Sequence, residues 1–201
     1  FLADKSDGAY ETLVDRLLRS PHFGERMALY WLDQVRFADT AGYHSDNHRD
    51  VWLYREYVIN SFNQNLPYDQ FTIEQLAGDL IPNSTRWQRI ASGYNRLIKT
   101  TEEGGAQGKE YQAKYDADRV RNIAEVWLAS TMGCCECHNH KFDPVTQKDF
   151  YSLQAVFAGV EHADRAMPLP KERNAKIATI DAQIAKLRER LQKFVRKSDY
   201  A

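Results

Sequence analysis

Apolar residues recur at intervals of three and four along most of the chain, which is the spacing of one face of an α-helix. In the first such segment, Leu13, Leu17 and Leu18 share one face. No stretch of useful length alternates apolar and polar residues as a strand does. The pattern predicts a mostly α, multi-helix domain, with helices over residues 10–19, 21–37, 50–62, 69–80, 85–97, 110–129 and 146–157.

Residues that end or begin helices separate these segments. Pro21 fits the first turn of the second helix, and Asp69 is expected to cap the fourth. Ser84 or Thr85 is the expected cap of the fifth, and Thr146 that of the last. Residues 100–108, which include a Gly-Gly pair, are expected to form a loop.

The last part of the chain carries a stricter pattern. Its apolar residues follow the a and d positions of a heptad repeat, at Ile177, Ile180, Ile184, Leu187, Leu191 and Phe194. We therefore predict a helical domain over 1–165, a Pro-containing hinge over 166–172, and a C-terminal coiled-coil helix over 173–201. The seam fits either a dimer or a helix that packs back on its own body or on an antiparallel partner.

Composition and charge restrict the function. The 201 residues include 43% hydrophobic and 12% aromatic side chains, enough for a real core, and 27 basic against 28 acidic residues leave a net charge of -1. That balance gives no electrostatic case for a nucleic-acid or anionic-membrane partner. No apolar run is long enough to span a membrane. The chain begins at Phe1 without a signal-like segment, so a leader has been removed or the chain is a piece of a longer protein.

The most informative motif is the string Cys134-Cys135-Glu136-Cys137-His138. A Cys-x-x-Cys-His string is the attachment signature for c-type haem, with thioethers at Cys134 and Cys137 and His138 as proximal iron ligand. All three cysteines fall in this string, whereas a disulfide framework would scatter them. Cys135 is left either as a small packed side chain or with a redox role.

Neighbouring residues are candidates for further haem contacts. His140 and Lys141 are expected to bond propionates, or to lie in a solvated loop, and His140 is also a candidate for facing a substrate. Candidates for the distal iron ligand are His22, His44, His48, His162, Met27 and Met167. We predict His22, because it begins a helix after Pro21; the alternative is that His22 merely caps or packs that helix.

Two other chemistries compete with haem. Cys134, Cys137, His44 and His48 have the types and spacings of a Cys₂His₂ zinc site. A thioredoxin-like dithiol lacks its βαβ context. Zinc does not require a histidine directly after the second cysteine, so the string favours haem.

A second group of polar residues lies in two loop regions. Carboxylates and arginines from both could form a calcium site, an acid/base pair, or ion pairs that lock helices together. The members are Asp39, Asp46, Arg49, Arg55, Glu102, Glu103, Glu110, Asp118 and Arg119.

Several strings together resemble the second planctomycete cytochrome C-type domain family. They are Ser20–Arg26, Trp31–Asp33, Arg36–Asp39, Tyr54-Arg55, Pro67–Phe71, Glu74–Leu80, Glu103–Gly105, Asp118–Val120 and Cys134–Pro144, within residues 10 to 160. Cys135, Met27 and Tyr30 depart from the family pattern. The resemblance implies one part of a large secreted protein, with an upstream cytochrome-like domain, a downstream domain reached through the heptad tail, and polysaccharide breakdown.

These observations lead to three functional hypotheses. The first is electron transfer through one covalent haem c, in a periplasmic or extracellular protein that processes polysaccharides or sugars and works with a redox partner or adjacent domains. The second is a catalytic haem domain with His140, Glu103 and Asp118 as acid/base candidates. The third is a structural or adhesive module.

Overall fold

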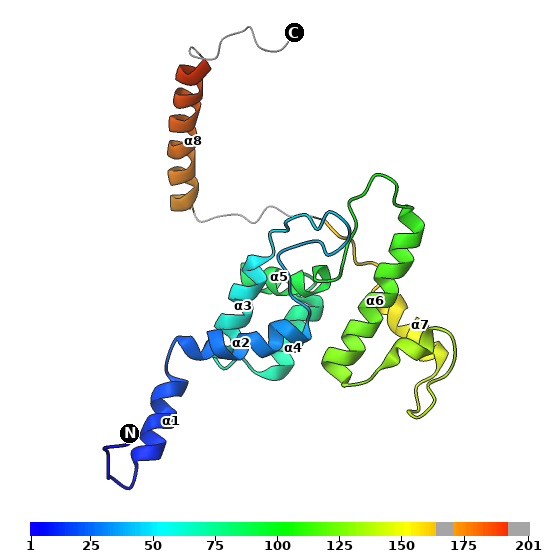
Figure 1. Cartoon of the computed structure of the whole chain (residues 1–201), viewed down its shortest axis with the longest axis horizontal. Coiled ribbons are helices and arrows are strands. Elements are labelled where there is room, and N and C mark those ends of the chain that lie inside the picture. Colours follow the sequence, from blue (N-terminus) through cyan, green and yellow to red (C-terminus); the bar gives the residue numbers. More distant parts are fainter. Residues whose placement is uncertain (164–170, 193–201) are drawn as a thin grey trace. The chain divides into compact units, whose positions relative to one another are not determined.

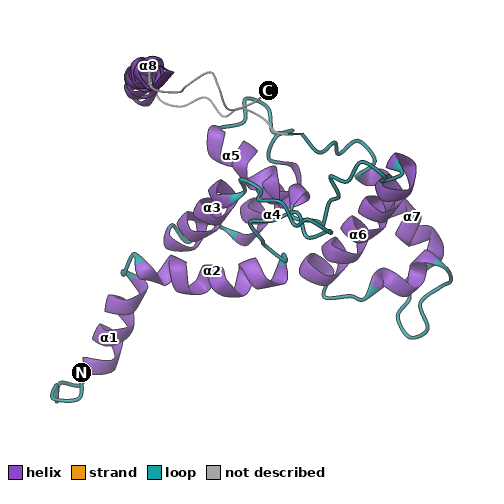
Figure 2. Cartoon of the chain, turned by 45° about the horizontal axis from the view of Figure 1, so that its top comes forward, coloured by secondary structure: helices purple, strands orange, loops and turns teal. Residues whose placement is uncertain are grey.

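The structure is a computed structural model that describes residues 1–163 and 171–192. Helices and loops make up all of this described part, as Figures 1 and 2 show, and it contains no strand. Extended pairing is limited to isolated bridges, Thr40 with His48 and Gly42 with Thr100. The predicted all-α class is confirmed. No helix in these ranges is long and apolar enough to cross a bilayer.

The chain divides into two compact units, Phe1–His162 and Ala163–Ala201. The helices of the first unit are α1 (Ala9–Leu18), α2 (His22–Gln34), α3 (Trp52–Asn63), α4 (Tyr68–Ala77), α5 (Arg86–Ala91), α6 (Gly108–Leu128) and α7 (Gln147–Val156), with the 3-10 helices η1 (Ser92–Arg96) and η2 (Met132–Glu136). The second unit contains α8 (Lys171–Gln192). Of the predicted hinge, residues 166–170 lie outside the described residues, and the last two belong to α8.

Some predicted helix ends are wrong for identifiable reasons. Helix α2 ends before residue 37 because Arg36 takes a positive φ of 58°, which the helix cannot continue. Asp69 does not cap α4; it lies in the first turn of a helix whose N-cap is Pro67. The fifth helix passes into η1 before Leu97.

Two predicted caps are confirmed. The Thr85 hydroxyl accepts a hydrogen bond from the backbone N–H of Gln88. In turn, the backbone N–H of Thr85 donates to the side-chain Oε1 of Gln88. Thr146 and Asp149 form the same reciprocal box at the start of α7. Such a box satisfies two of the backbone donors that a helix start leaves free, so both helices begin where the sequence indicates.

An aromatic cluster joins the helices of the first unit. The indole N–H of Trp31 on α2 lies 3.2 Å from the hydroxyl of Tyr54 on α3 and 3.0 Å from Oε1 of Gln75 on α4. The Trp31 ring also packs edge-on against Phe71 of α4 and Trp127 of α6. The polar groups of Trp31, Tyr54 and Gln75 bond to one another, so these three stay hydrogen-bonded within the cluster.

A buried carboxylate ties three helices together. Glu74 on α4 accepts hydrogen bonds from the Tyr57 hydroxyl (2.9 Å), Gln70 (2.9 Å) and the capping residue Gln88 (3.1 Å). Burial raises the pKa of Tyr57 well above its usual value, so its hydroxyl remains a donor. Glu74 and Gln75, in one of the family-like strings, therefore have a structural role.

A second apolar cluster forms where η2 packs between α6 and α7. Its buried members are Ala117, Val120, Ala124, Met132, Cys135 and Phe150. Two of them, Met132 and Cys135, belong to η2 itself. This packing anchors the cysteine string to the long helix α6.

Gly78 offers a test of the α4–α5 packing. A Cβ built there would lie 2.0 Å from the carbonyl oxygen of Gln88 and 2.2 Å from that of Glu74. We expect Gly78→Ala to lower the free energy of unfolding by about 1–3 kcal/mol, because backbone must move to make room. Gly93→Ala is the control, since its nearest contact would be an ordinary 3.8 Å. Urea denaturation measures both; equal stabilities would contradict the packing.

Candidate functional site

The cysteine string folds as a tight turn. The backbone N–H groups of Cys137 and His138 both donate to the carbonyl of Cys134, at 3.3 Å each. In a 3-10 turn, residues three apart lie one above the other. Cys134 and Cys137 therefore fall on one side of the turn, and Cys135 on another.

Burial separates the three thiols accordingly. Cys135 is fully buried, and its Sγ lies 3.6 Å from the carbonyl oxygen of Val145. Cys134 and Cys137 are exposed. Of the two readings of Cys135, the structure supports the packed side chain, and it leaves the other two thiols accessible to covalent chemistry.

The imidazole of His138 makes one hydrogen bond to the neighbouring backbone. The ring is exposed, and its Nδ1 lies 2.7 Å from the backbone carbonyl of Asn139. A carbonyl only accepts, so Nδ1 carries the proton and Nε2 keeps its lone pair. A backbone carbonyl that accepts one ring N–H in this way fixes the orientation of the ring, and metal-ligating histidines commonly have such a partner.

The donor set fits haem c. Two accessible thiols on one side of a turn, followed by an imidazole with a free Nε2, are the groups that covalent attachment and iron ligation require. Apolar surface is also present: the rings of Phe142 and Tyr151 are exposed, and the Tyr151 hydroxyl donates to the carbonyl of Glu136 at 3.0 Å. Those rings are available to contact an apolar macrocycle.

His140 shapes the loop that follows the string. Its side chain is only 9% exposed, and its Nδ1 accepts backbone N–H groups of Phe142 (3.3 Å) and Asp143 (2.9 Å). This nitrogen is therefore occupied by the loop's own backbone. Lys141, by contrast, is exposed, with its Nζ 5.1 Å from the centre of the Phe142 ring. The exposure of Lys141 leaves its side chain accessible to a propionate. The predicted propionate contacts of His140 and Lys141 both stay predictions.

A polar groove of about 440 Å³ runs along one face of α6 and reaches the string at Glu136. Asp118, a predicted acid/base residue, lines it and is held by both guanidinium nitrogens of Arg36 at 3.0 Å. Arg121 pairs with Glu136, and Lys114 with Glu110. All three carboxylates that line the groove are thus engaged in ion pairs. Those of Asp118 and Glu136 join different elements, and that of Glu110 lies within α6.

The groove is a feature that the sequence analysis missed. Its α6 residues recur every three or four positions, at Glu110, Lys114, Asp118 and Arg121, which places them on one helical face. That periodicity was a usable signal. The other wall of the groove consists of Arg36, Tyr43 and Lys99. Long-range folding brings these residues to α6, so no local sequence pattern predicts this wall.

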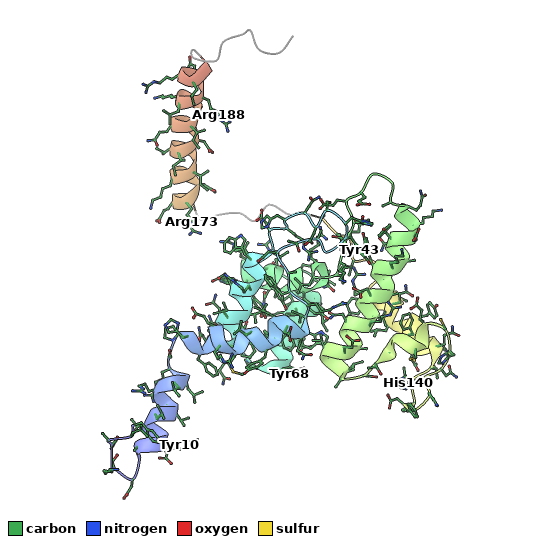
Figure 3. All side chains as sticks on the ribbon, in the orientation of Figure 1. Tyr10, Tyr43, Tyr68, His140, Arg173 and Arg188 are labelled. Atoms are coloured by element: carbon green, nitrogen blue, oxygen red, sulfur yellow. The ribbon has the colours of Figure 1, made fainter. Side chains whose placement is uncertain are left out.

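The structure separates residues that two hypotheses require together. His44 pairs with Glu103 at 3.2 Å, and the neighbouring Tyr43 ring contacts Tyr111 in the first turn of α6. The string packs further along α6, where Arg121 meets Glu136. Ten residues of helix separate positions 111 and 121, a rise of about 15 Å. Figure 3 shows the resulting separation of Tyr43 and His140.

That separation argues against a zinc centre and against one three-residue catalytic centre. Zinc ligands lie roughly 2.0–2.3 Å from the metal, so Cys134 and Cys137 cannot share an ion with His44 and His48 in this fold. Among the described residues there is no cluster of three or more His, Cys, Asp or Glu that could hold a metal ion. By the same distance, Glu103 and His140 do not face one another.

The histidines that are candidates for the distal ligand each contact another polar side chain. His22 begins α2 and lies 2.8 Å from Glu25, and in Figures 1 and 2 this end of α2 lies at the opposite end of the first unit from α7. His48 lies 3.1 Å from Asp50. Met27 belongs to α2, and Met167 lies outside the described residues. His22 as distal ligand stays a prediction that this arrangement does not favour.

His162, the remaining histidine candidate, is part of a buried basic cluster. Its Nε2 accepts a hydrogen bond from Arg119 at 2.9 Å, and Arg119 also donates to Asp116 at 3.2 Å. Burial, together with the positive charges of Arg119, Arg96 and Arg49, lowers the pKa of His162 to about 4. His162 is therefore neutral near pH 7 and helps to satisfy a buried guanidinium.

This cluster predicts a pH dependence of stability. The unfolded chain protonates His162 near pH 6.5, whereas the folded chain does so only near pH 4. The free energy of unfolding should therefore fall as the pH is lowered from about 6.5 to about 4. His162→Gln should flatten this part of the profile measured by thermal melts, and the exposed-site control His48→Gln should retain it. Identical slopes in both variants would contradict the assignment.

The three thiols should differ in reactivity. In protein made without haem and kept reduced, we expect iodoacetamide to modify Cys134 and Cys137 in the native state, and Cys135 only after denaturation, because burial excludes the reagent. Mass spectrometry would show two adducts before and three after unfolding, located by peptide mapping. Equally rapid native modification of Cys135 would contradict the packing of η2.

Comparison with known proteins assigns the first unit to a family. A sequence model of PSCyt2, described as a protein of unknown function (DUF1549), matches residues 1–162. Comparisons with curated proteins and with solved structures gave no match. The matched range includes α1 to α7 and the cysteine string, and it confirms the resemblance stated from the sequence motifs. The chain belongs to the PSCyt2 family, a cytochrome-like domain family of unknown function.

Proposed function

We propose that this chain binds one haem c covalently through Cys134 and Cys137, with His138 as the proximal iron ligand, and that it transfers electrons. One observation carries the proposal: the string exposes its first and last thiols while it buries the middle one. A turn selected only for packing would have no reason to present the two thiols of an attachment signature on one side.

The cysteines and His138 of the string, and the neighbouring Asn139 and Lys141, have distinct proposed roles. Cys135 fixes the turn in the core, so that Cys134 and Cys137 are held in the spacing that two thioethers need. The carbonyl of Asn139 holds His138 in the tautomer that leaves Nε2 free. Lys141 supplies a cation for a carboxylate at the macrocycle edge. The haem, when bound, supplies one-electron oxidation and reduction.

The position of the string supports exchange with a partner. Cys134, Cys137 and His138 all lie at the surface of the first unit, so a macrocycle attached there would be accessible from outside. A redox protein or an adjacent domain of a longer chain is the proposed partner. Because haem c attachment normally occurs outside the cytoplasmic membrane, the proposed location is periplasmic or extracellular, with a sugar-processing system as the proposed setting.

A second candidate function rests on the groove along α6. The groove is the size of a small-molecule site, contains charged and aromatic residues, and ends at Glu136 inside the string. A polar ligand such as a carbohydrate bound there would lie next to the haem-binding turn. In this second candidate function, Asp118 and Arg36 together position the ligand.

The test is expression of the chain with and without c-type haem maturation machinery, followed by visible spectroscopy and intact mass measurement. We expect one covalent haem, with a Soret band that survives acid–acetone extraction. Cys134→Ser and Cys137→Ser should each leave a single thioether and shift the reduced α-band in the pyridine haemochrome assay. The double variant should carry no covalent haem.

Cys135→Ala is the matched control, since it alters the adjacent thiol without touching the attachment positions. It should retain covalent haem even if the protein becomes less stable. His138→Ala should retain the thioether-attached haem and change the spin state of its iron, because the proximal ligand is removed. If the wild-type chain carries no covalent haem while a known cytochrome matures in the same cells, the proposed function is wrong.

A further inference from the structure

Helix α8 carries a row of exposed apolar side chains, its apolar seam. Ile177, Ile180, Ile184, Leu187 and Leu191 are between 40% and 62% exposed along 22 residues of helix. Phe194, which would continue the heptad, lies outside the described residues. Burial of apolar surface is the main favourable term in association, so a regular row of exposed Ile and Leu residues marks an interaction surface.

The width of this row indicates what kind of surface would cover it. A helix that packs on a globular body usually has apolar residues beyond positions a and d, in a stripe at least about 100° wide. Here the positions beside the seam are polar: Asp181 and Arg188 at e, and Lys176, Gln183 and Arg190 at g. An a/d-only stripe of this kind fits the groove of one other helix.

We propose that the partner is α8 of a second copy of this chain, parallel and in register. The central heptad places Ile184 at position a and Leu187 at position d, the combination that favours parallel two-stranded coils. In a parallel dimer a g residue meets the e residue five positions later on the other helix. Lys176 then faces Asp181 of the second copy, and the symmetry of the dimer forms this pair twice.

The charges do not oppose this arrangement. The next g–e pair joins the uncharged Gln183 to Arg188, so it adds no repulsion between like charges. An antiparallel dimer would use different contacts, because e residues then face e residues and Asp181 would meet Arg188 of the second copy. The two orientations therefore depend on different basic residues, Lys176 in one and Arg188 in the other. This difference allows a decisive test.

The experiment uses the whole 201-residue chain. Sedimentation equilibrium over a range of concentrations should show a reversible monomer–dimer equilibrium, independent of haem loading. Ile184→Asp should weaken dimerisation by about a hundredfold or more, because it places a carboxylate in the centre of the seam. Glu189→Gln, on the solvent-facing f position, is the matched control and should leave the dissociation constant unchanged.

Charge reversals test the orientation. Lys176→Glu should weaken the dimer roughly tenfold, since two attractive pairs become repulsive, and mixing it with Asp181→Lys should restore association as a heterodimer. Arg188→Glu should have little effect. The near-ultraviolet circular dichroism of the first unit reports whether each variant folds.

Three results would overturn the proposal. A monomer at all concentrations would show that the seam does not bind a second copy. A dimer insensitive to Ile184→Asp would place the interface elsewhere. A dimer weakened by Arg188→Glu and not by Lys176→Glu would be antiparallel.

Discussion

The burial of Cys135 is the constraint on which the arrangement of the cysteine string depends. Its side chain fills a space among Val120, Ala124 and Phe150, between the long helix α6 and the last helix of the first unit. A 3-10 turn repeats every three residues, so fixing the residue at 135 inside also fixes the residues at 134 and 137 on another side. The accessibility of Cys134 and Cys137 is therefore a consequence of core packing, and so is the projection of His138 beyond them.

Helix α6 determines which polar residues meet. It contributes Trp127 to the aromatic cluster, Val120 and Ala124 to the second apolar cluster, and Asp118 and Arg121 to the groove. Because a helix rises 1.5 Å per residue, groups that contact its first turns lie far from groups that contact its later turns. The loop around His44 belongs to the first set and the cysteine string to the second. This distance rules out their sharing a zinc ion, although the ligand types in the sequence were suitable.

Ion pairs account for most of the charged residues that had suggested catalysis or calcium binding. Asp118 pairs with Arg36, Glu110 with Lys114, and Glu103 with His44. Arg55 lies 3.8 Å from Glu56, and Arg119 lies buried between Asp116 and His162. Burying a guanidinium costs free energy unless acceptors bind it, and the neutral His162 supplies one such acceptor to Arg119. A cluster of charged residues in the sequence does not show whether its carboxylates form structural ion pairs or an acid/base site, because both arrangements place acidic and basic residues close together.

The sequence by itself determined the all-α class, the cap at Thr146, the choice between Ser84 and Thr85 for the other cap, the Cys-x-x-Cys-His string and the family, because helical periodicity, capping and short motifs each depend on residues at most a few positions apart. It predicted the ends of α2 and α4 less well, since the positive φ of Arg36 and the cap at Pro67 depend on how the chain turns between helices. Only the tertiary structure decided that Cys135 is buried, that Asp118 is held by Arg36, that His162 serves Arg119, and that His22 and His44 lie away from the string. Each of these contacts joins residues brought together by packing, over ten to more than eighty positions of chain, and no local pattern encodes such a contact.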